Sequence, residues 1–295
     1  MLSPILNKEI KNLTSMKTGG NVTECYFPEN ECELVQIIRS LKSENKKYIV
    51  LGNMSNVLLP DESLKTPLVV TTGMKKIEMI SDTVVYAEAG ASFTALSLEM
   101  CKNGLSGLEF AYGIPGTVGG AVYMNAGAYG GETKDVIKNV HYVDENGEVR
   151  IISKDECGFG YRRSAFQKED CVILGAEFVL SKKDAQECVS AAKELMQKRV
   201  DKQPLEYPSC GSTFKRPEGY FAGALIEEAG LKGFCVGGAQ VSEKHAGFVI
   251  NSDNATSGDV VSLMRYVRDA VKAKSGVVLE AEIKLLNENG EFFSL

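Results

Sequence analysis

Apolar residues recur at helical spacing in several parts of the chain, and this pattern predicts a set of amphipathic helices. The first begins after Asn30, an N-cap residue type with Glu33 three positions further on. Another has Ser257 as its predicted cap and carries apolar residues at Val260, Met264, Val267 and Val271. We expect further helices over 93–102, 184–200 and 223–229.

Short apolar runs and one alternating segment predict the strands. We expect strands over 48–51, 57–59, 84–89 and 171–180, and a hairpin over 140–152 that turns at Asn146-Gly147. The last predicted strand, Leu279 to Leu285, alternates apolar and charged residues, so Glu280 and Glu282 share one face. If partly buried, like charges at this separation raise the pKa of one acid. A half-exposed strand with a solvated polar face is the simpler interpretation.

The length and charge of the chain limit what it is expected to do. Its 295 residues exceed the size of one growing hydrophobic core, so we expect two or three domains of α+β architecture with a boundary near 184–203. A net charge of -6 argues against binding of nucleic acid or an anionic membrane. Without a secretory leader or a charge-free apolar stretch of membrane-spanning length, we expect a soluble, cytoplasmic protein with no obligate protein partner.

Cysteine and histidine usage argues against metal chemistry. The eight cysteines are scattered without a CxxC pair, and the chain has two histidines. Structural zinc requires clustered ligands, so we expect no metal site, and most of the thiols should be reduced and buried. Two histidines also leave little room for a Ser-His-Asp hydrolase.

Two glycine-rich loops are candidates for binding a phosphate-bearing ligand through main-chain amides. They are Gly52-Asn53-Met54-Ser55-Asn56 and Gly116-Thr117-Val118-Gly119-Gly120. When each loop is taken alone, a plain tight turn is the somewhat better explanation, and neither loop has the Walker or the Rossmann spacing.

Two polar motifs carry further candidates. Arg162, after Tyr161, has the residue type that grips a carboxylate, although adjacent arginines are more often solvated. Ser212 lies in a loop without a nearby histidine, so its hydroxyl fits a turn former or proton donor better than a nucleophile.

Taken together, the motifs resemble the UDP-N-acetylenolpyruvoylglucosamine reductase family. The resemblance covers about 13–286 in family order, and its shorter subtype fits the short interval between Arg162 and Ser212. The motifs that carry it are GLSGLEF at 104–110, GIPGTVGG at 113–120, NAGAYG at 125–130, Tyr161-Arg162, the stretch 202–214, GLKG at 230–233, VSEKHA at 241–246 and LEAE at 279–282.

The resemblance implies an FAD-binding fold of the vanillyl-alcohol-oxidase (PCMH) type. Two FAD-binding lobes are expected over 1–73 and 74–183, followed by a linker helix and a C-terminal α+β substrate-binding domain over 184–295. FAD would be held without a covalent bond by residues of the first glycine-rich loop and of the segment 113–120, which contains the second: Gly52, Asn53, Met54, Ser55, Asn56, Gly113, Ile114, Pro115, Gly116, Thr117, Gly119 and Gly120.

The resemblance also implies a reaction and a role for each matching residue. NADPH would reduce FAD, and hydride would pass from flavin N5 to the vinyl carbon of the enolpyruvyl ether of a UDP-sugar. Arg162 and Glu282 would stabilise the resulting enolate, and Ser212 would donate the proton. Tyr161 would line the site, and Lys202 and Arg216 would bind the diphosphate end of the substrate.

Two residues depart from the family pattern. Met54 stands where glycine is usual, so the loop must accept a side chain or change its backbone angle. Thr18 stands where an aliphatic residue is common, and we expect looser local packing there. Another flavoenzyme of this fold, such as an alcohol oxidase, would lack the set of Arg162, Ser212 and Glu282, and a binding module without turnover is a further alternative.

Overall fold

The computed structural model describes residues 3–167 and 170–295, and the chain divides into two compact units. The first unit contains residues 25–53 and 68–198 together with the N-terminal residues up to Pro4, and the second contains 5–24, 54–67 and 199–295. One division falls between Asn53 and Met54, and another falls inside helix α5 (Ala185–Lys202). The three domain ranges expected above stay a prediction.

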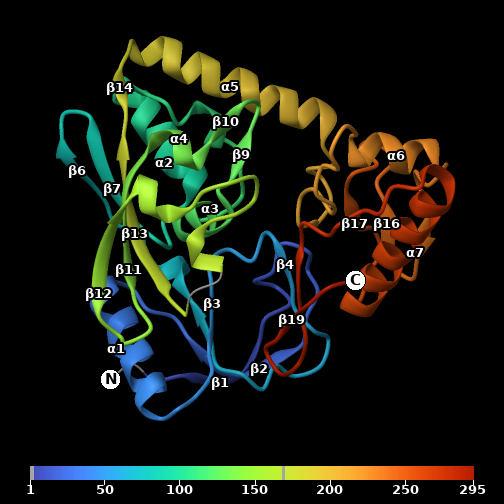
Figure 1. Ribbon diagram of the computed structural model, residues 1–295, viewed down its shortest axis with the longest axis horizontal. Helices are drawn as coiled ribbons and strands as arrows, with labels where there is room; N and C mark the ends of the chain where they lie inside the picture. The colour runs from blue at the N-terminus through green and yellow to red at the C-terminus, as the bar shows by residue number, and fades with distance from the viewer. Residues whose placement is uncertain (1–2, 168–169) are drawn as a thin grey trace. The chain divides into compact units, whose positions relative to one another are not determined.

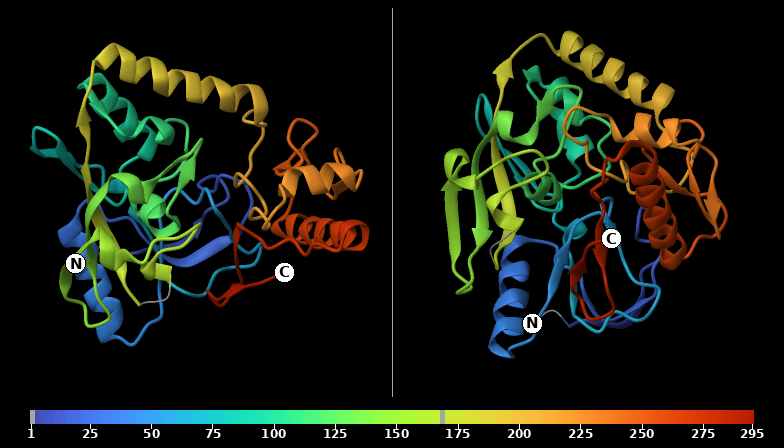
Figure 2. Two further views of the ribbon diagram at one scale, coloured as in Figure 1. Left: turned by 45° about the horizontal axis from the view of Figure 1, so that its top comes forward. Right: turned by 45° about the vertical axis from the view of Figure 1, so that its right-hand side comes forward.

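The first unit is built on a five-stranded antiparallel sheet in the order β12-β11-β13-β7-β6. Its strands are β6 (Ile77–Ser81), β7 (Val84–Glu88), β11 (Ile137–Val143), β12 (Val149–Ser153) and β13 (Val172–Val179). Strands β11, β12 and β13 lie side by side in Figures 1 and 2, and the predicted hairpin between β11 and β12 is confirmed. Strand β13 is central and mostly buried, which explains its nearly continuous apolar run.

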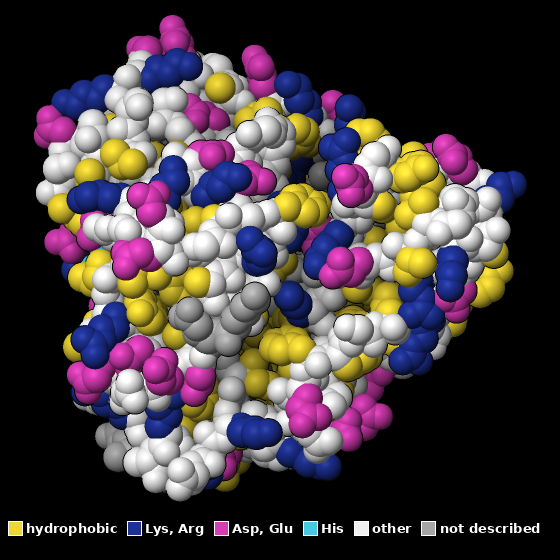
Figure 3. All heavy atoms as spheres, viewed as in Figure 1, with side chains coloured by type: hydrophobic (Ala, Val, Ile, Leu, Met, Phe, Trp, Pro, Cys, Tyr) yellow, Lys and Arg dark blue, Asp and Glu magenta, His cyan; other side chains and the backbone are white. Residues whose placement is uncertain are grey.

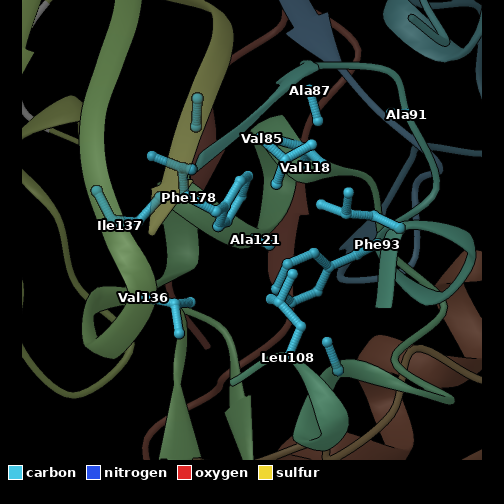
Figure 4. Packing of buried hydrophobic residues seen from close by; sticks show 14 of the residues in the cluster. Val85, Ala87, Ala91, Phe93, Leu108, Val118, Ala121, Val136, Ile137 and Phe178 are labelled. Carbon is cyan, nitrogen blue, oxygen red and sulfur yellow. The ribbon is translucent and has the colours of Figure 1, made fainter. Parts of the chain in front are cut away.

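Helices α2 (Phe93–Lys102) and α3 (Val118–Met124) contribute to the main core of this unit. Phe93 is fully buried, and its ring centroid lies 6.3 Å from that of Phe178 on β13. Figure 4 shows these two rings with Leu108 and with Val118 and Ala121 of α3. Helix α3 begins inside the second glycine-rich segment, so the expectation of a loop over Gly116–Gly120 is wrong for Val118, Gly119 and Gly120, which form the first turn of the helix.

A parallel strand set forms the other part of the first unit. Strand β5 (Leu68–Val70) pairs with β3 (Ile49–Leu51) and with the end of β2 (Asn21–Tyr26). Helix α1 (Glu31–Ser43) begins as predicted, because the Asn30 side chain accepts a 3.0 Å hydrogen bond from the Glu33 amide. Its buried face contains the expected residues, Leu34, Ile37, Ile38 and Leu41.

The remaining elements of the first unit are short. They are η1 (Thr71–Gly73), β8 (Leu105–Ser106), η2 (Glu109–Ala111), β9 (Gly127–Ala128), β10 (Gly131–Glu132), α4 (Thr133–Val136), η3 (Lys154–Cys157), η4 (Ala165–Gln167) and β14 (Ser181–Lys182).

The second unit packs two helices with a small antiparallel sheet. Helices α6 (Ala222–Glu228) and α7 (Ser257–Ser275) share a core with β15 (Cys235–Val236), β16 (Ala239–Val241) and β17 (Val249–Asn251). The apolar stripe predicted for α7 is confirmed, since all four of its residues are fully buried. Strand β1 (Ile5–Glu9) also belongs to this unit.

The predicted cap of α7 is wrong by one residue. Thr256 is the N-cap, and it exchanges hydrogen bonds with Asp259 in a capping box, 3.0 and 2.9 Å long. Ser257 is instead the first helical residue, because its amide donates to the Asp61 carboxylate at 2.8 Å and its hydroxyl donates to Leu59 O at 2.6 Å.

The strand predicted over Leu279–Leu285 is also largely wrong. Only Lys284–Leu286 forms a strand, β18, which pairs with β4 (Val57–Leu58) and β19 (Phe292–Phe293). The preceding extended segment bonds first to 213–215 and then to Asn56, and this change of partner interrupts the ladder. The period-two burial survives, since Leu279, Ile283 and Leu285 are buried.

Cysteines and surface charges follow ordinary rules. All eight cysteines are free, and the prediction that most are buried is confirmed for Cys25, Cys101, Cys157, Cys188 and Cys210. Acidic and basic side chains are interspersed over the face drawn in Figure 3. Within the described residues, no helix combines the length and apolarity that crossing a membrane requires.

Thr18, one of the two departures from the family pattern, is 2% exposed. Its hydroxyl has no hydrogen-bond partner in the described part of the chain. A buried hydroxyl in that state lowers stability relative to an aliphatic side chain of similar shape.

Candidate active site

The two glycine-rich loops meet in the first unit at Gly52 and Thr117. A Cβ added to Gly52 would lie 2.2 Å from Thr117 Oγ1 and 3.1 Å from its Cγ2. Thr117 is itself buried, and its hydroxyl accepts the Gly120 amide as the N-cap of α3. The loops therefore approach this closely only because residue 52 lacks a side chain.

The second loop is fastened to its surroundings by its own main chain. The Thr94 hydroxyl donates to Ile114 O at 2.8 Å, and Asn53 Nδ2 donates to Pro115 O at 2.6 Å. The Gly119 amide donates to Ala89 O at 2.8 Å, so it supports the loop and is not a donor toward a ligand. These three hydrogen bonds thus hold the backbone of this loop in place.

Met54 meets the geometric demand made by its family position. Its φ is +48°, in the left-handed region, and its side chain is 4% exposed. The loop thus accepts a side chain at a left-handed backbone angle that glycine adopts more easily, and the methionine side chain is buried.

Asn56 contacts the segment that carries Glu282, within the second unit. Its Nδ2 donates to Glu282 O at 3.3 Å, and its own carbonyl accepts the Lys284 amide at 3.0 Å. Sequence reasoning gave Asn56 to the cofactor loop and did not detect this contact. The two segments are more than two hundred positions apart, and no local pattern links them.

Ser212 and Glu282 lie on two segments that pair in the second unit. The Glu282 amide donates to Thr213 O at 2.9 Å, and the Lys215 amide donates to Glu280 O at 2.8 Å. This antiparallel pairing, centred on Phe214 and Ala281, puts Thr213 opposite Glu282. Thr213 is buried while Ser212 is exposed, so the backbone is anchored and the hydroxyl remains accessible.

His245 supports the Ser212 loop from behind. Its Nδ1 accepts the Gly247 amide at 3.1 Å, and Gly247 O in turn accepts the Thr213 amide at 2.9 Å. Burial lowers the pKa of His245 and favours the neutral ring that this acceptor role requires. The VSEKHA motif was noticed in the sequence, but this supporting role was not.

The two carboxylates of the closing segment differ in surroundings. Glu280 is mostly exposed and forms an ion pair with Lys215, whereas Glu282 is half-buried. Lys284 is on the same segment, and burial, reinforced by the charge of Lys215, lowers its pKa.

Arg162 lies in a turn of the first unit. Its φ is +53°, its Nη2 donates to Gly127 O at 3.2 Å, and its guanidinium carbon lies 5.0 Å from the centre of the Tyr161 ring. Tyr161 is 50% exposed. The expected diphosphate ligands Lys202 and Arg216 are both exposed in the second unit, and the Arg216 guanidinium lies 3.9 Å from the centre of the Phe221 ring.

The structure thus brings the segments of Ser212 and Glu282 together, and Gly52 with Thr117. Arg162 and Tyr161 belong to the first unit, whereas Ser212, Glu282, Lys202 and Arg216 belong to the second. In the described residues there is no group of three or more His, Cys, Asp or Glu side chains able to hold a metal ion.

Comparison with known proteins identifies the class of the fold. An FAD binding domain model matches residues 24–153, and a model of the UDP-N-acetylenolpyruvoylglucosamine reductase C-terminal domain matches 203–286. The crystal structure of UDP-N-acetylenolpyruvylglucosamine reductase from Thermus caldophilus superposes with a TM-score of 0.82 at 31% identity, covering 97% of this chain and 98% of that one. The fold class predicted from the sequence is therefore confirmed, and the chain is an FAD-dependent oxidoreductase.

Curated relatives narrow this class to one family. UDP-N-acetylenolpyruvoylglucosamine reductase of Caldanaerobacter subterraneus subsp. tengcongensis is 44% identical over 283 residues, covering 96% of this chain and 93% of its own length. That of Enterococcus faecalis is 42% identical over 284 residues, covering 96% and 94%. The chain belongs to the UDP-N-acetylenolpyruvoylglucosamine reductase family.

The loops of the first unit are compatible with FAD. Because Gly52 has no Cβ, its backbone lies directly against Thr117, and main-chain groups of two separate segments come close together, as binding of a pyrophosphate by main-chain amides requires. We expect Gly52, Asn53 and the segment from Gly113 to Gly120 to contribute to the cofactor site.

Replacing Gly52 with alanine tests this close approach. The new Cβ must displace Thr117 and disturb the cap of α3, so we expect a loss of about 2 kcal/mol in the free energy of unfolding and a smaller fraction of bound FAD. Urea unfolding and the absorbance ratio of flavin to protein measure the two effects. Gly120→Ala is the control for stability, since its Cβ would lie 3.6 Å from Thr117 Oγ1; an equal loss of stability in both variants would contradict the prediction.

Met54 yields a test of the left-handed backbone. At a positive φ, glycine is favoured over alanine, so Met54→Gly should be more stable than Met54→Ala by about 1 kcal/mol. Met74 is equally buried but has a φ of −79°, so there the alanine variant should be the more stable one. Denaturant unfolding of the four variants gives both differences, and the same order at both positions would refute the argument.

Proposed function

We propose that the protein reduces UDP-N-acetylenolpyruvoylglucosamine to UDP-N-acetylmuramate, using NADPH as the reductant. This reaction makes the muramic acid of bacterial peptidoglycan precursors. The shared name of relatives that match nearly the whole chain supports it, and the observation that carries it is the pairing of the Ser212 and Glu282 segments. Because substrate and reductant are charged small molecules of the cell interior, we propose a cytoplasmic enzyme.

FAD, when bound in the first unit, would supply the redox chemistry, which is transfer of hydride from NADPH to the vinyl carbon of the enolpyruvyl group. Two electrons and one proton leave NADPH as hydride, and a second proton must reach the adjacent carbon to complete the lactyl ether. The chain's own residues therefore have two tasks: they stabilise the negative charge that develops on the enolate, and they donate that proton.

We assign stabilisation of the enolate charge to Arg162 and Glu282. A guanidinium offers two parallel N–H donors to a carboxylate, which is the group into which the enolate charge spreads. Glu282 can help only in its protonated form, as a hydrogen-bond donor. Its amide is bonded to Thr213 O and its carbonyl to Asn56 Nδ2, so its backbone is fixed on both sides.

We assign donation of the second proton to Ser212. A hydroxyl is a weak acid, but a carbanionic enolate is a strong base, and the exposure of Ser212 allows solvent to return the proton. Tyr161 would line the carboxylate end of the substrate. Lys202 and Arg216 would bind its diphosphate, since both offer exposed cationic donors.

Ser212→Ala separates proton donation from hydride uptake. We expect flavin reduction by NADPH to stay near the wild-type rate and reoxidation by the enolpyruvyl substrate to slow about 100-fold or more. Stopped-flow absorbance of the flavin follows both half-reactions. Ser209→Ala, three residues upstream, is the control and should reoxidise normally; a normal rate in the Ser212 variant would remove the proton-donor assignment.

The two carboxylates of the closing segment are distinguished by replacing each with leucine. Glu282→Leu removes the proposed donor, for which a glutamine would substitute an N–H, so reoxidation should slow about 100-fold. Glu280→Leu breaks only an exposed ion pair with Lys215, so its effect should stay within about threefold. Steady-state and single-turnover rates for both variants decide the matter, and equal losses would mean that the wrong carboxylate was chosen.

A further inference from the structure

Arg162 has a left-handed backbone conformation, which arginine rarely adopts. The turn from Gly160 to Arg163 is closed by the Arg163 amide, which donates to Gly160 O at 3.1 Å, and Arg162 is its third residue with a φ of +53°. A positive φ at this position is the mark of a type II turn, where glycine or asparagine is preferred. The direction of the Arg162 side chain therefore depends on contacts that hold the turn from outside.

Gln167 supplies one such contact. Its Nε2 donates to Arg162 O at 3.0 Å and to Tyr123 O at 2.8 Å. Tyr123 is in the last turn of α3, where carbonyl groups lack helical partners. A single amide thus joins the carbonyl of Arg162 to the end of a helix that is packed in the core.

Asn125 supplies a second contact from the same helix end. It is fully buried, caps α3 with a φ of +42°, and donates from Nδ2 to Gly160 O at 2.9 Å and to Glu132 Oε2 at 3.0 Å. Its Oδ1 accepts the Lys134 amide at 2.9 Å. Because both amide hydrogens and the oxygen have partners, the asparagine cannot rotate without breaking several bonds.

These contacts fix the turn at both of its ends. Gly160 O is held by Asn125, and Arg162 O is held by Gln167, while the hydroxyl of Ser164 donates to Tyr123 O at 2.8 Å. All three bonds lead to the C-terminal end of α3.

We propose that Gln167 and Asn125 are positioning residues, which hold Arg162 in its left-handed conformation and so aim its guanidinium at the carboxylate of the substrate. The catalytic part of this inference rests on the proposed function. The conformational part does not, because it concerns only the hydrogen bonds of the first unit.

Limited trypsin digestion of the FAD-loaded protein tests the conformational part. Gln167→Met keeps the side-chain volume but removes both donated bonds, so cleavage after Arg162 or Arg163 should accelerate about fivefold or more, as mass spectrometry of the fragments would measure. Asn125→Gly, which retains a residue suited to positive φ, should act in the same direction. Asn139→Leu is the matched control, because it removes another partly buried amide whose partner is Glu177.

The reoxidation half-reaction tests the catalytic part. Gln167→Met should slow reoxidation by the enolpyruvyl substrate about 10- to 100-fold, because displacing a catalytic group by about 1 Å lowers the reaction rate by a factor of this order. Flavin reduction by NADPH should stay within about twofold of wild type, as should both half-reactions of Asn139→Leu.

A double variant separates positioning from general loss of stability. If Gln167 acts through Arg162, then Arg162→Ala with Gln167→Met should reoxidise no more slowly than Arg162→Ala alone. If the double variant instead reoxidises more slowly than Arg162→Ala, by the factor seen for Gln167→Met alone, the positioning role is overturned. Unchanged trypsin cleavage in both the Gln167 and the Asn125 variants would also overturn it.

The outcomes also distinguish this inference from the proposed function. If Arg162→Ala reoxidises at the wild-type rate, the assigned role of Arg162 fails, and with it the catalytic part of the inference. If Arg162→Ala is slow but Gln167→Met is not, the proposed function survives and the positioning role is overturned.

Discussion

The close approach of Gly52 to Thr117 is the contact on which the proposed cofactor-binding surface of the first unit depends. Thr117 caps α3, α3 packs into the core beside Phe93 and Phe178, and the strand before Gly52 belongs to the parallel set. Any side chain at residue 52 would push apart two stretches of backbone whose positions the core fixes. The absence of one Cβ thus lets two separate parts of the hydrophobic core form one surface of main-chain groups.

At several positions the chain adopts a left-handed backbone angle without glycine. Met54 and Arg162 both adopt a positive φ, which costs each about 1 kcal/mol relative to an ordinary conformation. The strain at Met54 is compensated by burial of its side chain, whereas at Arg162 it is compensated by a hydrogen bond that its carbonyl accepts and one that its guanidinium donates. The difference is consistent with the role proposed for Arg162, since a buried side chain serves packing and a partly exposed arginine can reach a ligand.

The sequence was informative where one local pattern determines the outcome. The helical spacing after Asn30, the hairpin at Asn146-Gly147 and the stripe on α7 each depend on neighbouring residues, and each was predicted. The strand over Leu279–Leu285 was not, because alternation reports burial, and a strand also needs a continuous partner. The partners of this segment are 213–215 and Asn56, which lie far away in the sequence, and periodicity contains no information about them.

The same limit explains which site residues escaped detection. Ser212 and Glu282 were found through family motifs, but the bonds that support them come from His245 and Asn56, and a single histidine or asparagine side chain has no periodic signal. Both catalytic candidates share one arrangement: the main chain of Thr213 and Glu282 is bonded in place, and the hydroxyl of Ser212 stays exposed. An enolate is stabilised most by groups that do not have to reorganise when charge develops, because their ordering cost was met on folding. A weak acid such as serine can serve as the proton donor only in such a setting, so the hydrogen bonds behind the Ser212 loop are as necessary to the proposed chemistry as the hydroxyl itself.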